Sequence, residues 1–112
     1  GGAAIANTAS VADPEEAESI IDDALSAFGR IDIVVNNAGI LRDQTFHNVT
    51  LENFHAVLNV HLMGVVHVTR AAWRIICLNG WGRVVLTSSG SGILATSASP
   101  ITARQRWVSL DS

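Results

Sequence analysis

The stretch IDIVVNNAG, residues 31–39, decides the fold of this chain. Its first five residues are mostly β-branched and apolar, which is typical of a strand buried on both faces of a parallel sheet. Its last four residues are of types that favour a turn, so the strand is expected to end there. The stretch therefore predicts an interior strand that runs directly into a polar turn.

A helix is predicted before this strand, over residues 14–28. Apolar side chains recur there at i, i+3 and i+4, so they form one stripe along a helix. Asp13 is placed as the N-cap, and Glu16 follows three residues later, as in a capping box. Gly29 is placed to end the helix in the left-handed conformation.

Two further strands and one long helix complete the pattern. Residues 3–11 alternate weakly and predict a strand, residues 51–78 predict a long helix, and residues 83–87 predict a buried strand. The resulting order is β-α-β-α-β. This order indicates the α/β class and part of a Rossmann-like, doubly wound parallel sheet.

Composition excludes several classes of protein. The chain has 112 residues, 48% of them hydrophobic and 15% charged, so it has enough apolar side chains for a core. Its net charge of -3 predicts no nucleic-acid partner. No apolar run is long enough to span a bilayer, so we expect no membrane association and a cytoplasmic protein, or a peroxisomal one in a eukaryote. The four histidines lack the i, i+4 spacing of a helical zinc site, so no metal is expected.

Two polar segments follow the predicted interior strands, where doubly wound sheets bind ligands. In Asn36–Gly39 the amides can tie neighbouring strands together at the edge of the sheet, and the Ala-Gly pair leaves room for a flat ligand; an ordinary β-turn is the alternative. In Ser88–Gly92 a hydroxyl can donate to a substrate carbonyl; a plain Ser/Gly loop is the alternative. A serine hydrolase has weaker support, because the chain has no G-x-S-x-G motif.

Three segments together resemble the short-chain dehydrogenase/reductase family. They are VADPEEAESIIDDALSAFGRIDIVVNNAGILRD (11–43), LENFHAVLNVHLMGVVHVTRAAW (51–73) and GRVVLTSSGSG (82–92). They are most similar to the branch of the peroxisomal multifunctional type 2 enzymes. The resemblance implies an oxidoreductase that uses NAD or NADP to transfer hydride at a secondary alcohol or ketone, with 3-hydroxyacyl-CoA as one candidate substrate.

The resemblance also implies roles for individual residues. Ser10 and Val11 match a strand end that touches the adenine. Four residues match the segment beside the ribose and nicotinamide, namely Asn36, Asn37, Ala38 and Gly39. Ser89 matches the catalytic serine that orients the substrate carbonyl. His61 stands where most members have asparagine, as in the type 2 branch.

Other parts of the family pattern do not occur in this sequence. Thr102 and Arg106 occupy the positions of the catalytic tyrosine and lysine, and the chain contains neither residue type. The glycine-rich turn that holds the pyrophosphate is also absent. We therefore expect an inactive chain with weak or absent cofactor binding. The alternative is a non-catalytic interaction fragment, a homo-oligomer formed through helix 51–78, because this helix packs against its counterpart in the family.

The spacing of the lost residues predicts a reading-frame error. If Ile101 is encoded by ATT, a shifted frame reads TAC, tyrosine, at position 102. Gln105 as CAA followed by AGA reads AAG, lysine, at position 106. Joining the third base of each codon from 94 to 111 with the first two bases of the next codon can spell GNFGQSNYGTAKMGIAGL, with the tyrosine at position 102 and the lysine at position 106, which resembles the family pattern. We therefore expect residues 1–93 to be the central part of a Rossmann-like domain. Residues 94–112 are expected to form an irregular, out-of-frame tail that ends at an out-of-frame stop.

Overall fold

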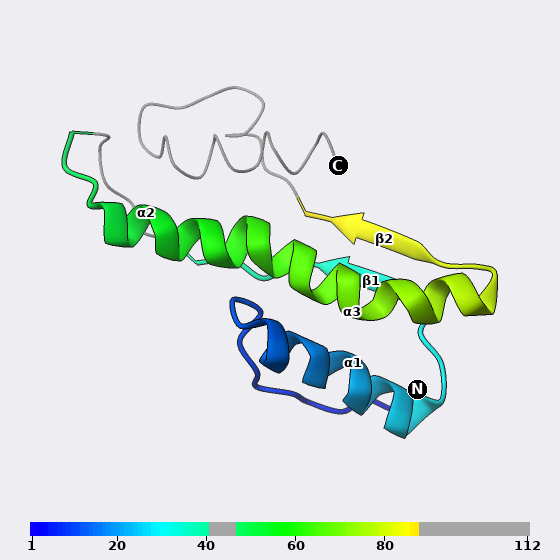
Figure 1. Ribbon diagram of the computed structural model, residues 1–112. Coiled ribbons are helices and arrows are strands. Elements are labelled where there is room, and N and C mark those ends of the chain that lie inside the picture. The colour runs from blue at the N-terminus through cyan, green and yellow to red at the C-terminus, as the bar shows by residue number, and fades with distance from the viewer. Residues whose placement is uncertain (41–46, 88–112) are drawn as a thin grey trace.

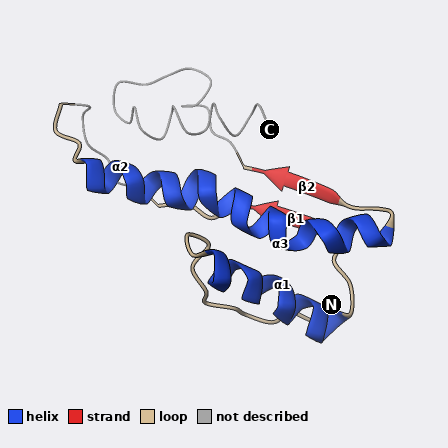
Figure 2. Cartoon of the chain, viewed as in Figure 1, coloured by secondary structure: helices blue, strands red, loops and turns tan. Residues whose placement is uncertain are grey.

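The computed structural model describes residues 1–40 and 47–87 (Figure 1). Along the chain, the elements are helix α1 (Pro14–Phe28), strand β1 (Ile33–Asn36), helix α2 (Leu51–Leu58), π-helix η1 (Asn59–Met63), helix α3 (Gly64–Asn79) and strand β2 (Arg83–Leu86). Figure 2 shows α2, η1 and α3 as one continuous rod beside the two strands. None of the described helices is long and apolar enough to cross a membrane.

Helix α1 begins and ends where the sequence predicts. The Asp13 carboxylate accepts hydrogen bonds from the backbone N–H groups of Glu15 and Glu16, at 2.9 and 3.1 Å. Gly29 ends the helix with φ 77°, in the left-handed region that favours glycine. The capping box is only half right, because the Glu16 carboxylate accepts from the N–H of Ser10, at 3.4 Å, and not from Asp13.

The long helix also forms as predicted, with one irregularity. Thr50 caps it by accepting from the N–H of Asn53 at 3.2 Å, and Gly80 ends it with φ 71°. Residues 59–63 form a single π-helical turn, which the apolar pattern did not predict. Such turns insert an extra residue into an α-helix and are frequent at functional sites.

The two strands pair in parallel and confirm the α/β class. Ile33 lies opposite Arg83, and Asn36 lies opposite Leu86. The core forms between this sheet and the two helices that pack on each other. Its buried members come from α1, from β1 and the residues just before it, and from α3; they are Ala17, Ile21, Ile31, Val34, Val68 and Ala72.

The strand predicted over residues 3–11 is wrong. These residues form neither helix nor strand; in Figure 1 they run beside α1, in dark blue. The Asn7 amide donates to the Asp23 carboxylate at 2.7 Å, which fastens the segment to α1. A strand needs a neighbour to accept its ladder hydrogen bonds, and within residues 1–40 and 47–87 the sheet consists of β1 and β2 alone.

Candidate functional site

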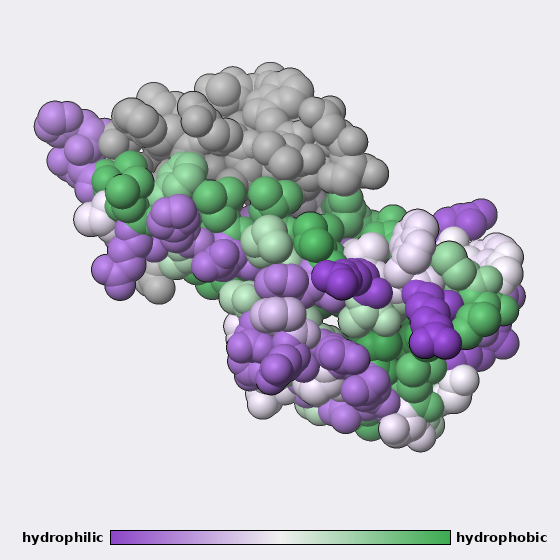
Figure 3. Space-filling model, in the orientation of Figure 1, coloured by the Kyte–Doolittle hydropathy of each residue, from purple (hydrophilic) through white to green (hydrophobic). Residues whose placement is uncertain are grey.

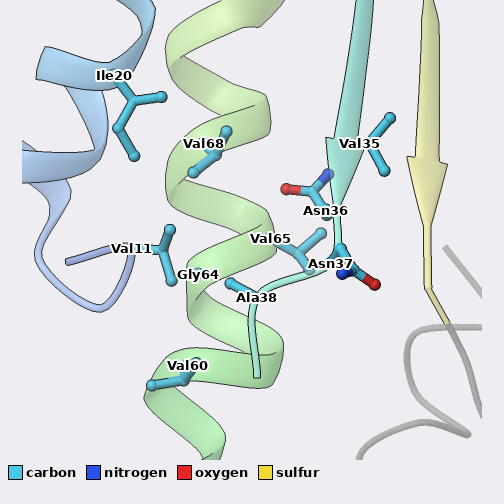
Figure 4. A pocket seen from close by; sticks show the side chains of 10 residues that line it. All are labelled: Val11, Ile20, Val35, Asn36, Asn37, Ala38, Val60, Gly64, Val65 and Val68. Atoms are coloured by element: carbon cyan, nitrogen blue, oxygen red, sulfur yellow. The ribbon is translucent and has the colours of Figure 1, made fainter. Parts of the chain in front are cut away.

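A small hollow lies at the carboxyl end of β1, between that strand and the helical rod (Figure 4). Its volume is about 130 Å³. Four of the six predicted cofactor residues line it, namely Val11, Asn36, Asn37 and Ala38. The other two do not line the hollow: Ser10 precedes Val11 in the sequence, and Gly39 follows Ala38. The structure therefore brings together two segments that lie far apart in the sequence.

The opposite wall of the hollow is apolar and comes mainly from the helical rod. Val60 belongs to η1, and Gly64 and Val65 belong to the first turn of α3. Gly64 is needed at this point, because a Cβ there would lie only 2.8 Å from Cγ2 of Val11. The hollow thus has apolar faces and one amide-bearing strand end, the mixture typical of a small-molecule site.

Asn36 has a structural role at this site. Its side-chain N–H donates to the Thr69 hydroxyl at 3.2 Å, and Figure 4 shows the amide turned toward α3. Its backbone carbonyl accepts from the N–H of Thr87 at 3.1 Å. Asn36 therefore joins β1 both to α3 and to the residue that follows β2. The amides were predicted to tie neighbouring strands together; the Asn36 amide instead ties β1 to helix α3, and the link toward β2 is made by its backbone carbonyl.

His61 makes a backbone contact that the sequence analysis did not predict. Its side chain is 8% exposed, and it is the buried polar residue of the described part of the chain. Its Nε2 lies 3.1 Å from the backbone N and 2.9 Å from the backbone O of Ile40. Gly39 fits beneath the ring, because a Cβ there would lie 2.6 Å from Cε1 of His61. The sequence analysis placed His61 where most family members have asparagine, but it gave the side chain no partner.

His67 makes a second contact of this kind. Its Nδ1 lies 3.0 Å from the carbonyl oxygen of Val11, one of the residues that line the hollow. No spacing rule in the sequence pointed to this contact, because the two residues are 56 positions apart. It depends on how α3 packs beside the segment before α1.

The predicted catalytic positions, Ser89, Thr102 and Arg106, lie outside the described residues. The same holds for the tail expected over residues 94–112. Within residues 1–40 and 47–87, no cluster of three or more histidine, cysteine, aspartate or glutamate residues could hold a metal ion.

Comparison with known proteins defines the class to which this fold and hollow belong. The model of the short chain dehydrogenase family matches residues 1–101, so the chain belongs to that family. A solved short chain dehydrogenase from Mycobacterium avium superposes with a TM-score of 0.86 at 36% sequence identity. That superposition covers 98% of this chain and 40% of the solved chain.

Two curated relatives resemble the chain more closely in sequence. A putative short-chain type dehydrogenase/reductase of Mycobacterium tuberculosis is 53% identical over 93 residues, which are 83% of this chain and 32% of the relative. The peroxisomal multifunctional enzyme type 2 of Mus musculus is 50% identical over 93 residues, which are 83% of this chain and 12% of the mouse enzyme. The chain therefore spans about a third or less of the length of these relatives.

Proposed function

We propose that this chain forms one wall of the dinucleotide site of a short-chain oxidoreductase that uses NAD or NADP. The observation that carries the proposal is the hollow at the end of β1, which gathers Val11, Asn36, Asn37 and Ala38. Val11 and Ala38 would lie against one ring system of the cofactor, and Asn37 would offer its amide to a ribose hydroxyl. The cofactor, when bound, would supply or accept the hydride.

The size of the hollow limits what it can hold. Pockets that enclose a whole small ligand measure roughly 300–1,000 Å³. This hollow measures about 130 Å³, so it fits one ring system of a dinucleotide and not the whole molecule. The remainder of the cofactor needs the glycine-rich turn at a helix N-terminus, and that turn does not occur in this sequence.

Weak cofactor binding is the expected consequence. In a calorimetric titration of the chain with NAD, we expect a dissociation constant in the millimolar range or weaker, about 4 kcal/mol of binding free energy. The physical reason is the missing pyrophosphate site. A dissociation constant near ~10 μM would contradict this, because it would need about 3 kcal/mol more than the hollow is expected to provide.

The proposed reaction in the parent enzyme is hydride transfer at a secondary alcohol or ketone, with a 3-hydroxyacyl-CoA as substrate. This rests on the resemblance to the type 2 branch. The residues at the expected tyrosine and lysine positions, Thr102 and Arg106, cannot perform the proton transfer, because a threonine hydroxyl is too weak an acid. We propose a lost base near codon 93 as the origin of both changes.

Self-association is the second candidate function, and the exposed apolar side of the helical rod favours it. Trp73 is 57% exposed and Val66, two turns before it on the same face, is 44% exposed. Figure 3 shows apolar side chains gathered along α2 and α3. Beside them, a groove of about 460 Å³ runs between α3 and β2; six apolar residues line it, namely Leu62, Val65, Val66, Trp73, Val84 and Leu86. We propose that a second copy of the chain covers this side.

Light scattering tests the self-association. At ~100 μM we expect the mass of a dimer, because large exposed apolar patches recruit partners. Trp73→Glu should shift the mass toward the monomer, since a carboxylate would have to be buried in the interface. Trp81→Glu is the control, because Trp81 is also half exposed but precedes β2 and lies outside the rod. A monomer mass for the unmodified chain would contradict the proposal.

A further inference from the structure

Asn79 and Gly80 form the only Asn-Gly pair in the sequence, and they lie where helix α3 ends. Asn79 is the last residue of α3, and Gly80 follows with φ 71°, in the left-handed region. The Gly80 N–H donates to the carbonyl oxygen of Cys77 at 3.2 Å. Asparagine is chemically labile, and glycine has no Cβ to shield its backbone nitrogen from a neighbouring amide. The end of α3 therefore contains a pair of residues that can react with each other.

The Asn79 side chain fastens the end of α3 to the start of the sheet. Its Nδ2 donates to the carbonyl oxygen of Ile31 at 3.2 Å, across 48 positions of the sequence. Ile31 is buried and belongs to the core cluster, just before β1. Figure 1 shows the connection from α1 to β1 passing beside the last turns of α3. The amide therefore joins two elements that the core holds together.

The same side chain can react with the backbone that follows it. Once the Gly80 nitrogen has lost its proton, it can attack Cγ of Asn79. The bond from Cγ to Nδ2 then breaks, Nδ2 leaves as ammonia after taking up a proton, and a five-membered cyclic imide remains. Water opens the imide at either carbonyl and gives aspartate or isoaspartate. One water is consumed and one ammonia is released, so the conversion needs no oxidant, reductant or enzyme.

The folded end of α3 blocks this reaction. Closing the ring requires Cβ, Cα and the carbonyl carbon of Asn79 to lie nearly in one plane with the Gly80 nitrogen. A helical ψ of about −42° turns that nitrogen roughly 80° out of the plane. The Gly80 N–H must also leave the Cys77 carbonyl, and the Asn79 amide must leave the Ile31 carbonyl. The reaction therefore proceeds only when the last turn of α3 opens.

The last turn of α3 is placed to open without unfolding the rest of the chain. Cys77 and Leu78 are both exposed, so they bury little apolar surface. Helix ends of this kind open at a lower free energy than the core does. Ile76, one residue earlier, packs against the core cluster. The opening can therefore be confined to residues 77–80.

We propose that Asn79–Gly80 is a deamidation site that the fold masks, and that its conversion to aspartate unfastens the end of α3 from the start of β1. A carboxylate has no hydrogen to donate to the Ile31 carbonyl, and the oxygens of the two groups repel each other. The new negative charge also lies at the negative end of the helix dipole, which destabilises α3. A brief opening of the native chain thus becomes permanent, whether or not a cofactor occupies the hollow.

Mass spectrometry of the tryptic peptide 75–83, released by cleavage after Arg74 and Arg83, measures the conversion. At mildly alkaline pH we expect the folded chain to convert roughly 10- to 100-fold more slowly than the same chain in urea, the protection that two hydrogen bonds give. Leu78→Gly should speed conversion of the folded chain by roughly 4-fold, because glycine weakens the last turn of α3. Ala27→Gly is the matched control, exposed in the last turn of α1, and should leave the rate unchanged. Circular dichroism checks that both variants fold.

Asn79→Asp, which has the chemical structure of one product, tests the loss of the fastening. The Gly80 N–H donates to Cys77, and the Arg83 N–H donates to the carbonyl oxygen of Asp32 at 3.0 Å. In hydrogen exchange, we expect both amides to exchange roughly 3- to 30-fold faster in this variant. Asn59→Asp is the control, because it makes the same change at an exposed position of the rod, and it should leave both amides unchanged.

Each part of the proposal has a result that overturns it. Equal conversion rates in the folded chain and in urea would show that the fold does not mask the site. Equal acceleration by Leu78→Gly and Ala27→Gly would show that only global unfolding exposes it. Unchanged exchange of the Gly80 and Arg83 amides in Asn79→Asp would show that the amide does not fasten α3 to the start of β1.

Discussion

No hydride transfer is expected from the 112-residue chain. Pure protein mixed with NAD and a 3-hydroxyacyl-CoA should give no rise in the absorbance of reduced cofactor above the uncatalysed rate. General acid–base catalysis typically supplies ~10²–10⁴-fold, and the chain has no tyrosine and no lysine to provide it. The missing glycine-rich turn removes cofactor affinity as well. Measurable oxidation of the substrate would contradict this account.

A double substitution provides the control for that expectation. Thr102→Tyr with Arg106→Lys restores the two residue types at the family spacing, yet we expect it to leave the chain inactive. The pyrophosphate site would still be missing, so the cofactor would still bind weakly.

Sequencing the DNA across codons 90–108 tests the proposed lost base. An intact frame that cannot spell the family pattern would refute that origin.

Ala17→Asp is expected to unfold the chain. Ala17 has no exposed surface and packs in the core cluster with Ala72 of α3. A carboxylate there would lose its water without a partner, at a cost of several kcal/mol, comparable to the whole stability of a small domain. Circular dichroism at 25 °C should show the loss of most helical signal, since α1 and α3 share this contact.

Ala27→Asp is the matched control for this substitution. It makes the same chemical change in the same helix, but Ala27 is exposed. A surface substitution should cost no more than about 0.5–1 kcal/mol, including the unfavourable placement of a negative charge near the helix C-terminus. If Ala17→Asp melted at the same temperature as Ala27→Asp, the α1–α3 contact would not be the core of this fold.

Local signals in the sequence predicted the helices well and one strand badly. Asp13 caps α1 through bonds to residues two and three positions away, so spacing alone reveals it, and Thr50 caps α2 in the same way. The strand predicted over residues 3–11 did not form, because a strand needs a neighbouring strand to accept its backbone hydrogen bonds. Its weak alternation could not show that Asn7 would instead bond to Asp23 of α1.

The candidate site was likewise predictable only where its signals lie close together in the sequence. Asn36–Gly39 could be found because they end an apolar, β-branched stretch, although the strand it forms is buried on one face only, with Ile33 and Val35 exposed. Val11 was found through the family resemblance. The contacts of His61 and His67 could not be predicted, because they join residues 21 and 56 positions apart. The π turn at residues 59–63 was also invisible, since one inserted residue changes the apolar period too little to detect.

The central claim is that the hollow at the end of β1 is the part of a dinucleotide site that this chain retains. The most direct measurement is a map of amide chemical-shift changes as NAD is added to the ¹⁵N-labelled chain. We predict that the changes centre on Val11, Asn37 and Ala38 and saturate only at millimolar cofactor, as one wall of a site should. Changes confined to the groove beside Trp73, or no changes at any concentration, would contradict the claim.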